Sequence, residues 1–361
     1  MRALVIDRYG EPDEVLRLAE TDTPQPGPGE VRVRMRLSPV NPSDFNTIRG
    51  TYQQSLARAI WNRGGGPLHF DPERTRPLGG LPVSPGADGM GVVEAAGGGW
   101  YARRLVGRRV IVMGAPSGNW REQVVLPAVQ AMPVPAGVSD EQAAMFLVNP
   151  MTAWAMVTRV LKVPRGAWLL QSGGGSQLAR MVIRLGRRRG FRTISLVRRA
   201  GVAAELEALG ADAVVDASRE DVIARVASLT GNAGVRHALD CVGADTMATM
   251  LRCLAPGAHL LCYGSLGGDM LHFPVRDLML AAARVEGFLL PQWIAGRGLA
   301  TRLHAARKVG KLIAEGTLAS EVGTIYPMAE YAAALRESVK PARGGKVLLR
   351  FPRLFMVAVR G

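Results

Sequence analysis

The sequence contains few cysteines, and those few are not clustered. Cys241, Cys253 and Cys262 are the three among 361 residues, and no two of them have the C-x-x-C spacing. This odd, scattered set argues against a disulfide framework and favours a reducing compartment, for which we expect the cytoplasm. The five histidines are also scattered. Because a zinc site needs clustered Cys, His or carboxylate ligands, we expect no bound metal.

A long hydrophobic segment is also missing. No stretch of about 18 uncharged apolar residues occurs, which argues against a membrane-spanning helix and against a membrane partner. The first ten residues, MRALVIDRYG, are typical of a strand and not of a signal peptide. With a hydrophobic fraction of 48%, the chain is instead typical of a well-packed globular protein.

Acidic residues are in deficit. The 30 Asp and Glu residues face 45 Lys and Arg, so the formal net charge is +15. Such a balance favours anionic partners, namely nucleic acid, acidic lipid or a polyphosphorylated small molecule. No basic motif interleaved with aromatic residues occurs, so we do not expect a nucleic acid. The run Arg187-Arg188-Arg189 is typical of a solvated helix face.

The length of the chain predicts two domains. Residues 1–127 alternate short apolar runs with Gly and Pro, which is typical of short strands joined by turns. Residues 128–295 alternate predicted strands and helices, which indicates an α/β fold with a doubly wound parallel sheet. We expect residues 296–361 to return to the first domain. From Gly166 onward, the pattern predicts strands at 168–171, 193–197, 213–216, 235–240, 259–263 and 346–350, and helices at 177–189, 202–209, 221–230, 245–254, 299–315 and 328–338.

A glycine-rich loop, Ser172-Gly173-Gly174-Gly175-Ser176, follows the first of these strands and precedes a helix. Glycines let the backbone approach a pyrophosphate, and the positive end of the helix attracts it. The G-x-G-x-x-G pattern is incomplete, because Gln177 and Ala179 stand where glycines are expected. By itself the loop could equally be an ordinary turn. The alternating strands and helices around it favour a dinucleotide site.

The end of the next strand indicates which dinucleotide is bound. About 20 residues after such a loop, NAD-binding proteins commonly offer Asp or Glu to the ribose hydroxyls. Here the strand ends in Val197-Arg198-Arg199, with two guanidinium groups and no carboxylate. Arginine binds phosphate through a planar fork of charged donors, so this position favours NADPH. The alternative is a pair of solvated surface arginines.

Three further motifs carry a resemblance to a known family. They are Asn41-Pro42-Ser43-Asp44, the turn Gly118–Glu122 and the segment Val148–Ala153. Together they resemble the medium-chain dehydrogenase/reductase superfamily, in particular its trans-2-enoyl thioester (enoyl-CoA/ACP) reductases. Segments 263–266, 287–293 and 338–341 extend the resemblance over nearly the whole chain. It implies a GroES-like catalytic domain over 1–127, completed by 296–361, and a Rossmann-type NADPH-binding domain over 128–295.

The resemblance also implies roles for individual residues. Tyr52, which follows the N-P-S-D motif, corresponds to a tyrosine that assists the reduction of the double bond by stabilising or protonating the enolate. Asn41 and Trp293 are expected to contact the substrate. The residues expected to contact the cofactor are Asn149, Gly175, Ser176, Gln177, Leu178, Arg198, Arg199, Tyr263, Gly264, Ser265, Leu266, Phe288, Leu289, Leu290 and Lys346.

Other functions remain open at this point. The cysteine ligand and the cysteine-rich lobe of zinc alcohol dehydrogenases are missing here, which implies a zinc-independent enzyme. The segment Gln53–Pro82 is longer than the enoyl reductase pattern has, which keeps a quinone or alkenal reductase as an alternative. A second alternative is an NADPH-binding protein with an RNA-binding basic surface. Dimers are usual in the family and are the commonest symmetric assembly, so we expect a homodimer.

Overall fold

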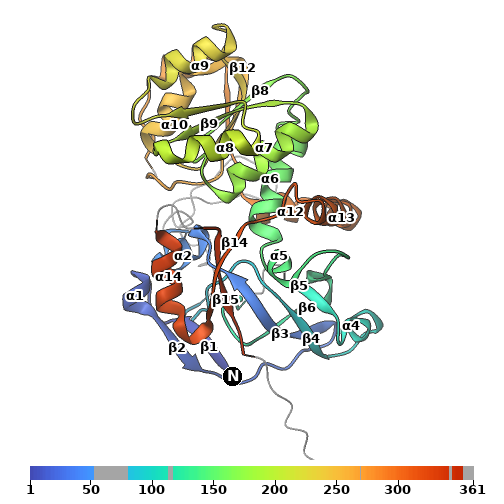
Figure 1. Cartoon of the computed structure of the whole chain (residues 1–361). Coiled ribbons are helices and arrows are strands. Elements are labelled where there is room, and N and C mark those ends of the chain that lie inside the picture. The colour runs from blue at the N-terminus through green and yellow to red at the C-terminus, as the bar shows by residue number, and fades with distance from the viewer. Residues whose placement is uncertain (53–79, 113–116, 269, 341–343, 353–361) are drawn as a thin grey trace, which may run out of the picture. The chain divides into compact units, whose positions relative to one another are not determined.

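The computed structural model describes residues 1–52, 80–112, 117–268, 270–340 and 344–352 (Figure 1). The chain divides into two compact units. Unit 1 comprises Met1–Leu147 and Glu321–Gly361, and unit 2 comprises Val148–Ser320. Most of the segment Gln53–Pro82, namely residues 53–79, lies outside the described residues.

Unit 1 contains mostly short strands. One sheet has the order β14 (Val322–Pro327), β15 (Lys346–Arg350), β3 (Glu30–Pro39), β4 (Met90–Ala96), β5 (Arg109–Val112) and β7 (Ala131–Pro133), with β6 (Gln123–Pro127) also paired to β3. A second, two-stranded sheet pairs β1 (Arg2–Ile6) with β2 (Leu16–Glu20). The helices are α1 (Pro12–Val15), α2 (Pro42–Arg49), α4 (Trp100–Leu105), α5 (Asp140–Ala144) and α14 (Tyr331–Val339). The β-rich character predicted for this part of the chain is confirmed.

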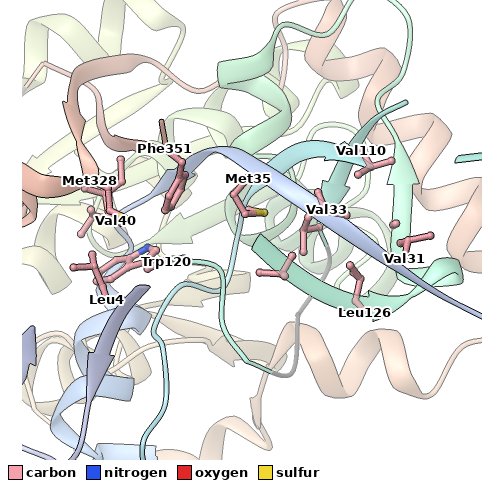
Figure 2. Packing of buried hydrophobic residues seen from close by; sticks show 14 of the residues in the cluster. Leu4, Val31, Val33, Met35, Val40, Val110, Trp120, Leu126, Met328 and Phe351 are labelled. Atoms are coloured by element: carbon pink, nitrogen blue, oxygen red, sulfur yellow. The ribbon is translucent and has the colours of Figure 1, made fainter. Parts of the chain in front are cut away.

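The core of unit 1 follows from the alternation in β3. Val31, Val33 and Met35 point to one face and are at most 1% exposed. They pack in one cluster with Trp120 and Phe351, from segments far apart in the sequence (Figure 2). Burying each such side chain stabilises the fold by about 1.5–3 kcal/mol.

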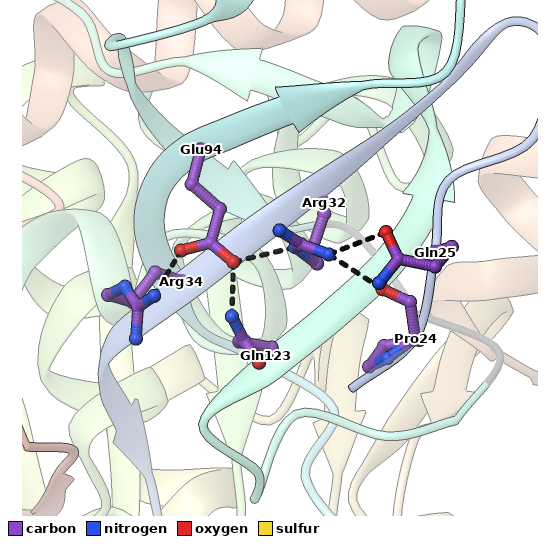
Figure 3. A network of polar contacts seen from close by, with 6 residues as sticks. All are labelled: Pro24, Gln25, Arg32, Arg34, Glu94 and Gln123. Carbon is purple, nitrogen blue, oxygen red and sulfur yellow. Dashed lines mark hydrogen bonds and ion pairs between the residues drawn. The ribbon is translucent and has the colours of Figure 1, made fainter. Parts of the chain in front are cut away.

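A polar network joins three strands of unit 1. Arg32 of β3 donates to the carboxylate of Glu94 in β4 at 2.7 Å, and Arg34 forms an ion pair with the same carboxylate. Gln123 of β6 also donates to Glu94 (Figure 3). Because Glu94 and both arginines are less than one-third exposed, solvent screens these contacts less than it screens surface pairs. The network therefore supports the register of β3 against its two neighbours.

Unit 2 contains a parallel sheet. Its order is β10 (Ala213–Asp216), β9 (Arg192–Val197), β8 (Trp168–Gln171), β11 (Val235–Asp240), β12 (Leu254–Cys262) and β13 (Arg284–Gly287). The chain starts in the middle at β8, runs outward to β10 and then returns to β11 on the other side. This is the strand order 3-2-1-4-5-6 of dinucleotide-binding folds, whose ligands bind where the order reverses.

Helices cover both faces of this sheet. Alternate residues of the strands, such as Ile194 and Val215, pack with α9 (Val222–Thr230) and α10 (Ala244–Leu251). Val197 packs with α7 (Gln177–Arg189) and α8 (Ala203–Leu209). The remaining helices are α6 (Thr152–Ala155), α11 (Val275–Ala281), α12 (Leu290–Ala295) and α13 (Leu299–Ala314), and π-helical turns occupy Leu147–Met151 and Met156–Val160. The doubly wound α/β fold predicted for this part of the chain is confirmed.

The units are bounded differently from the predicted domains. The first boundary lies after Leu147 and not after residue 127, and the second lies after Ser320 and not after residue 295. The first differs because α5 packs on β3 and β5 of unit 1. The second differs because Arg184 of α7 donates to the carbonyls of Thr317 and Ala319, which holds the end of α13 in unit 2. The prediction that helix 299–315 returns to the first domain was wrong.

None of the helices in the described ranges has the length and apolar character that crossing a membrane requires.

Candidate active site

The glycine-rich loop lies at the carboxyl edge of β8, in the centre of the sheet of unit 2. Ser176 caps α7 by accepting a hydrogen bond from the backbone N–H of Ala179 at 3.2 Å. Gly174 packs so closely on β9 that an added Cβ would meet Ser195 at 2.9 Å. Gly175, in contrast, is exposed. The loop thus presents bare backbone and the positive end of α7 at the reversal point of the sheet, which fits a pyrophosphate group.

A buried carboxylate that we did not select from the sequence holds this loop in place. Asp240, the last residue of β11, is 0% exposed. It accepts hydrogen bonds from the hydroxyl of Ser172 at 2.6 Å and from the backbone N–H of Gly243 at 2.8 Å. It therefore ties the loop after β8 to the loop after β11. The sequence contained one signal for this role of Asp240, namely an acidic residue at the carboxyl end of an apolar strand.

The two arginines assigned to the 2′-phosphate lie directly after β9 and are exposed. Neither guanidinium forms an ion pair with any residue of the described chain. Arg180 nearby differs, because its side chain is paired with Glu205 at 2.7 Å. Unpaired guanidinium groups at the carboxyl edge of the sheet fit an anionic ligand group.

The other predicted cofactor residues of unit 2 differ in their exposure. Leu178, Phe288 and Leu290 are buried, whereas Ser265, Leu266 and Leu289 are exposed; Asn149, Ser176, Gln177, Tyr263 and Gly264 are half-buried. The Tyr263 hydroxyl is buried beside the Cys241 thiol, and burial raises the pKa of Tyr263 well above its ordinary value. A contact of Tyr263 with a dinucleotide would therefore use its ring or backbone. Contact of these residues with the cofactor stays a prediction.

Trp293, the predicted substrate residue of unit 2, is half-buried in α12. Its ring meets that of Trp154 edge-on at 6.3 Å, and the guanidinium of Arg297 lies 5.1 Å from its centre. These contacts hold the indole in place. Contact with a substrate is not tested by them and stays a prediction.

Unit 1 places the N-P-S-D motif around the start of α2. The carboxylate of Asp44 accepts hydrogen bonds from the backbone N–H of Asn41 at 2.7 Å and of Ala87 at 3.0 Å. The side-chain amide of Asn41 donates to Asp88 at 3.5 Å. Asn41 is 1% exposed, so in this structure it has a structural role at the helix start, and substrate contact stays a prediction.

Lys346 completes this buried group. It is the first residue of β15 and is 4% exposed. Burial raises the pKa of Asp44 to about 6, while the backbone N–H groups of Asn41, Ala87 and Gly86 and the positive charge of Lys346 oppose a larger rise. Lys346 was predicted to contact the cofactor. The structure adds a role for it as a positive charge near a buried carboxyl group.

The stability of the protein should depend on Asp44 between about pH 4 and pH 6. The folded pKa of about 6 exceeds the ordinary value of 3.8, so the folded state binds the proton more tightly. The stabilising contribution of the protonated carboxyl is complete below the ordinary pKa and is lost as the pH rises through the folded pKa. Asp44→Asn resembles the protonated acid and does not titrate. The free energy of unfolding of the wild type, relative to Asp44→Asn, should fall between pH 4 and 6 in urea titrations. A difference that is independent of pH would contradict this assignment.

Tyr52, the predicted catalytic residue, follows the end of α2. Gly50 ends that helix with a φ of 72°, and an added Cβ there would meet the ring of Tyr9 at 2.6 Å. Both features require glycine at this position. Arg49 is held by a two-fold hydrogen bond to Glu11. Tyr52 is half-buried and helical. The residues before Tyr52 are therefore well anchored, and its catalytic role stays a prediction.

The described residues contain no group of three or more His, Cys, Asp or Glu side chains placed to hold a metal ion.

Comparison with known proteins agrees with this architecture. The family model described as "Alcohol dehydrogenase GroES-like domain" matches residues 27–136, and that described as "Zinc-binding dehydrogenase" matches residues 178–306. The mitochondrial enoyl-[acyl-carrier-protein] reductase of Xenopus tropicalis is 28% identical, over 96% of this chain and 95% of that protein.

Solved structures of similar proteins cover nearly the whole chain as well. A mycobacterial quinone oxidoreductase is 27% identical with a TM-score of 0.78, over 97% of this chain and 99% of that one. A mycobacterial structure in complex with NADPH is 27% identical with a TM-score of 0.80, over the same shares of the two chains. With its two matched domains in this order, the chain belongs to the medium-chain dehydrogenase/reductase superfamily, and it is an NADPH-dependent oxidoreductase similar to the enoyl and quinone reductases.

Proposed function

We propose that the protein reduces the activated carbon–carbon double bond of a 2-enoyl thioester. The observation that carries this proposal is the similarity, over nearly the whole chain, to proteins named enoyl-[acyl-carrier-protein] reductase. Tyr52 supports it, because a phenol after the N-P-S-D motif suits the charge that develops on a thioester oxygen.

Residues of the two units would have different roles in this reaction. The loop 172–176 and the arginines 198 and 199 would hold NADPH, which supplies a hydride when it is bound. Reduction at the β-carbon moves negative charge onto the thioester oxygen. The Tyr52 hydroxyl would donate a hydrogen bond to that oxygen or provide the proton for the α-carbon.

A substrate screen tests this proposal. NADPH oxidation is measured with 2-enoyl-CoA esters, quinones and 2-alkenals at equal concentrations. We expect kcat/KM to be highest for an enoyl thioester. Turnover of quinones with no turnover of any enoyl thioester would refute the proposal and leave the enzyme class intact.

The second candidate is a quinone or alkenal reductase. It is supported by the mycobacterial quinone oxidoreductase, whose structure matches nearly the whole chain. A third candidate, an NADPH-binding protein with an RNA-binding surface, predicts slow turnover of every substrate and RNA affinity that falls steeply with salt. The same screen separates all three.

We infer that catalysis uses no metal, although one matching family model carries the description "Zinc-binding dehydrogenase". Dialysis against excess EDTA should then leave kcat unchanged within about twofold, because no step depends on a Lewis acid. Elemental analysis should find clearly less than one zinc per chain. A loss of activity that added Zn²⁺ restores would overturn this inference.

We propose a homodimer formed through the edge of the parallel sheet. Strand β13 pairs with β12, and its other edge is paired with no strand of the described chain. Next to it in sequence, α11 contains no buried residue, and its Met279 and Leu280 are 69% and 83% exposed. An open strand edge with exposed apolar side chains favours pairing with a second copy.

Leu280→Glu should therefore convert a dimer to a monomer, because it places a charge in the apolar contact. Val129→Glu, a substitution at another exposed residue, is the matched control and should leave the dimer intact. Sedimentation velocity distinguishes the two states. A wild type that is monomeric at micromolar concentration would exclude the dimer.

The cytoplasm remains the proposed compartment. It is supported by Cys241, Cys253 and Cys262, which are free thiols as expected in a reducing environment.

A further inference from the structure

A small basic cleft lies in unit 2, where α7, α13 and the turn after α6 meet. Its cavity is about 150 Å³ and is lined by four basic side chains, Arg188 and Arg189 of α7 and Lys308 and Lys311 of α13. The apolar residues Trp154 and Leu185 also line it. Within this unit, four cations therefore face one small cavity with an apolar wall.

Little negative charge compensates these cations. Glu315 forms ion pairs with Arg188 at 2.8 Å and with Lys311 at 3.6 Å. Arg189 and Lys308 form no hydrogen bond or ion pair through their side chains within the described part of the chain. The four cations thus share one carboxylate. The negative end of a helix dipole is equivalent to about half a charge, so the C-terminus of α7 does not balance the remainder. Like charges held around one cavity repel one another, and a bound anion would relieve that repulsion.

The cleft is distinct from the cofactor loop. Helix α7 has 13 residues, so at about 1.5 Å per residue it is roughly 20 Å long. The glycine-rich loop precedes the first residue of this helix, and Arg189 is its last. A ligand in the cleft therefore lies at the opposite end of α7 from the pyrophosphate site.

The size of the cavity limits the ligand. A cavity of about 150 Å³ is smaller than the roughly 300–1,000 Å³ that encloses a whole drug-sized ligand. It suits one compact, highly charged group, while the rest of the ligand extends outside. Arg and Lys together provide many N–H donors, which match the oxygens of linked phosphates.

We propose that this cleft binds the diphosphate or triphosphate group of a small molecule, at a site separate from the NADPH site. Two kinds of molecule carry such a phosphate group: free nucleotides, such as ATP, and coenzyme A. The proposal does not depend on the identity of the reduced substrate.

The test is calorimetric titration of the protein carrying one equivalent of NADPH, which keeps the cofactor site occupied. The probes are pyrophosphate, ATP and CoA. We expect one binding event per chain that weakens as ionic strength rises. Arg189→Gln/Lys308→Gln should weaken it at least tenfold, and Lys308→Glu should weaken it as well. Both positions are exposed.

Arg103→Gln/Arg104→Gln is the matched control, because it removes two exposed positive charges from α4 of unit 1. It should leave probe affinity unchanged, and NADPH affinity should be unchanged in all variants. Whichever of ATP and CoA binds more tightly identifies the kind of ligand that the cleft binds. The proposal is overturned if no probe binds to the wild type, if the cleft variants bind as tightly as the wild type, or if a second equivalent of NADPH displaces the probe from the wild type.

Discussion

Tyr52→Phe is expected to lower kcat for the preferred enoyl thioester by a factor of roughly 10²–10³. The substitution removes the hydroxyl and keeps the ring, so the packing around the half-buried side chain is preserved. Losing one donor to a developing oxyanion costs about 2.7–4 kcal/mol, which corresponds to that factor. NADPH affinity should change little. Steady-state kcat and the dissociation constant of NADPH, measured on the same preparation, give both values.

Tyr101→Phe is the control for this experiment. Tyr101 lies in α4 of unit 1 and is 37% exposed, so the variant also loses one phenol hydroxyl, but at a position with no proposed role. It should retain full activity. If Tyr52→Phe lost less than about threefold, water would be the proton source, and the quinone reductase alternative would lead because a quinone can be reduced without this protonation.

Arg198→Ala/Arg199→Ala is expected to raise the KM for NADPH by roughly 10²-fold and to leave the KM for NADH within a few-fold. A hydrogen bond to a charged group contributes about 1.5–3 kcal/mol, or at least tenfold in affinity. We take the lower value for each arginine, since both are exposed and solvent screens their charges. NADH lacks the 2′-phosphate and so loses no such contact. The ratio of the two kcat/KM values therefore measures the effect directly.

Arg103→Ala/Arg104→Ala changes the net charge by the same amount in unit 1 and should leave this ratio unchanged. Equal losses with NADPH and NADH in the Arg198→Ala/Arg199→Ala variant would show that the two arginines act on general electrostatics or on stability. In that case the 2′-phosphate would be bound elsewhere.

Much of the local structure followed from sequence patterns. The predicted helix 177–189 and the predicted strands 213–216, 235–240 and 346–350 have the observed bounds. These segments have strong local signals: apolar periodicity, a Ser N-cap or a final Gly. The prediction was less accurate where two elements adjoin. The helix predicted to Leu254 ends at Leu251, because Leu254 already pairs with Val235 in the sheet.

The sequence by itself determined the fold class and the positions of the glycine-rich loop and of Arg198 and Arg199 after two neighbouring strands, because each depends on residues close together in the chain. The tertiary structure alone decided which distant residues meet. The positive charge of Lys346 lowers the pKa of Asp44, which lies about 300 residues away in sequence. The hydroxyl of Ser172, after β8, donates to Asp240 at the end of the neighbouring strand β11. Helix α13 belongs to unit 2 because Arg184 of α7 donates to the carbonyls that follow it. No pattern of period 2 or 3.6 encodes such contacts, since they depend on strand order and on which helix face is already covered.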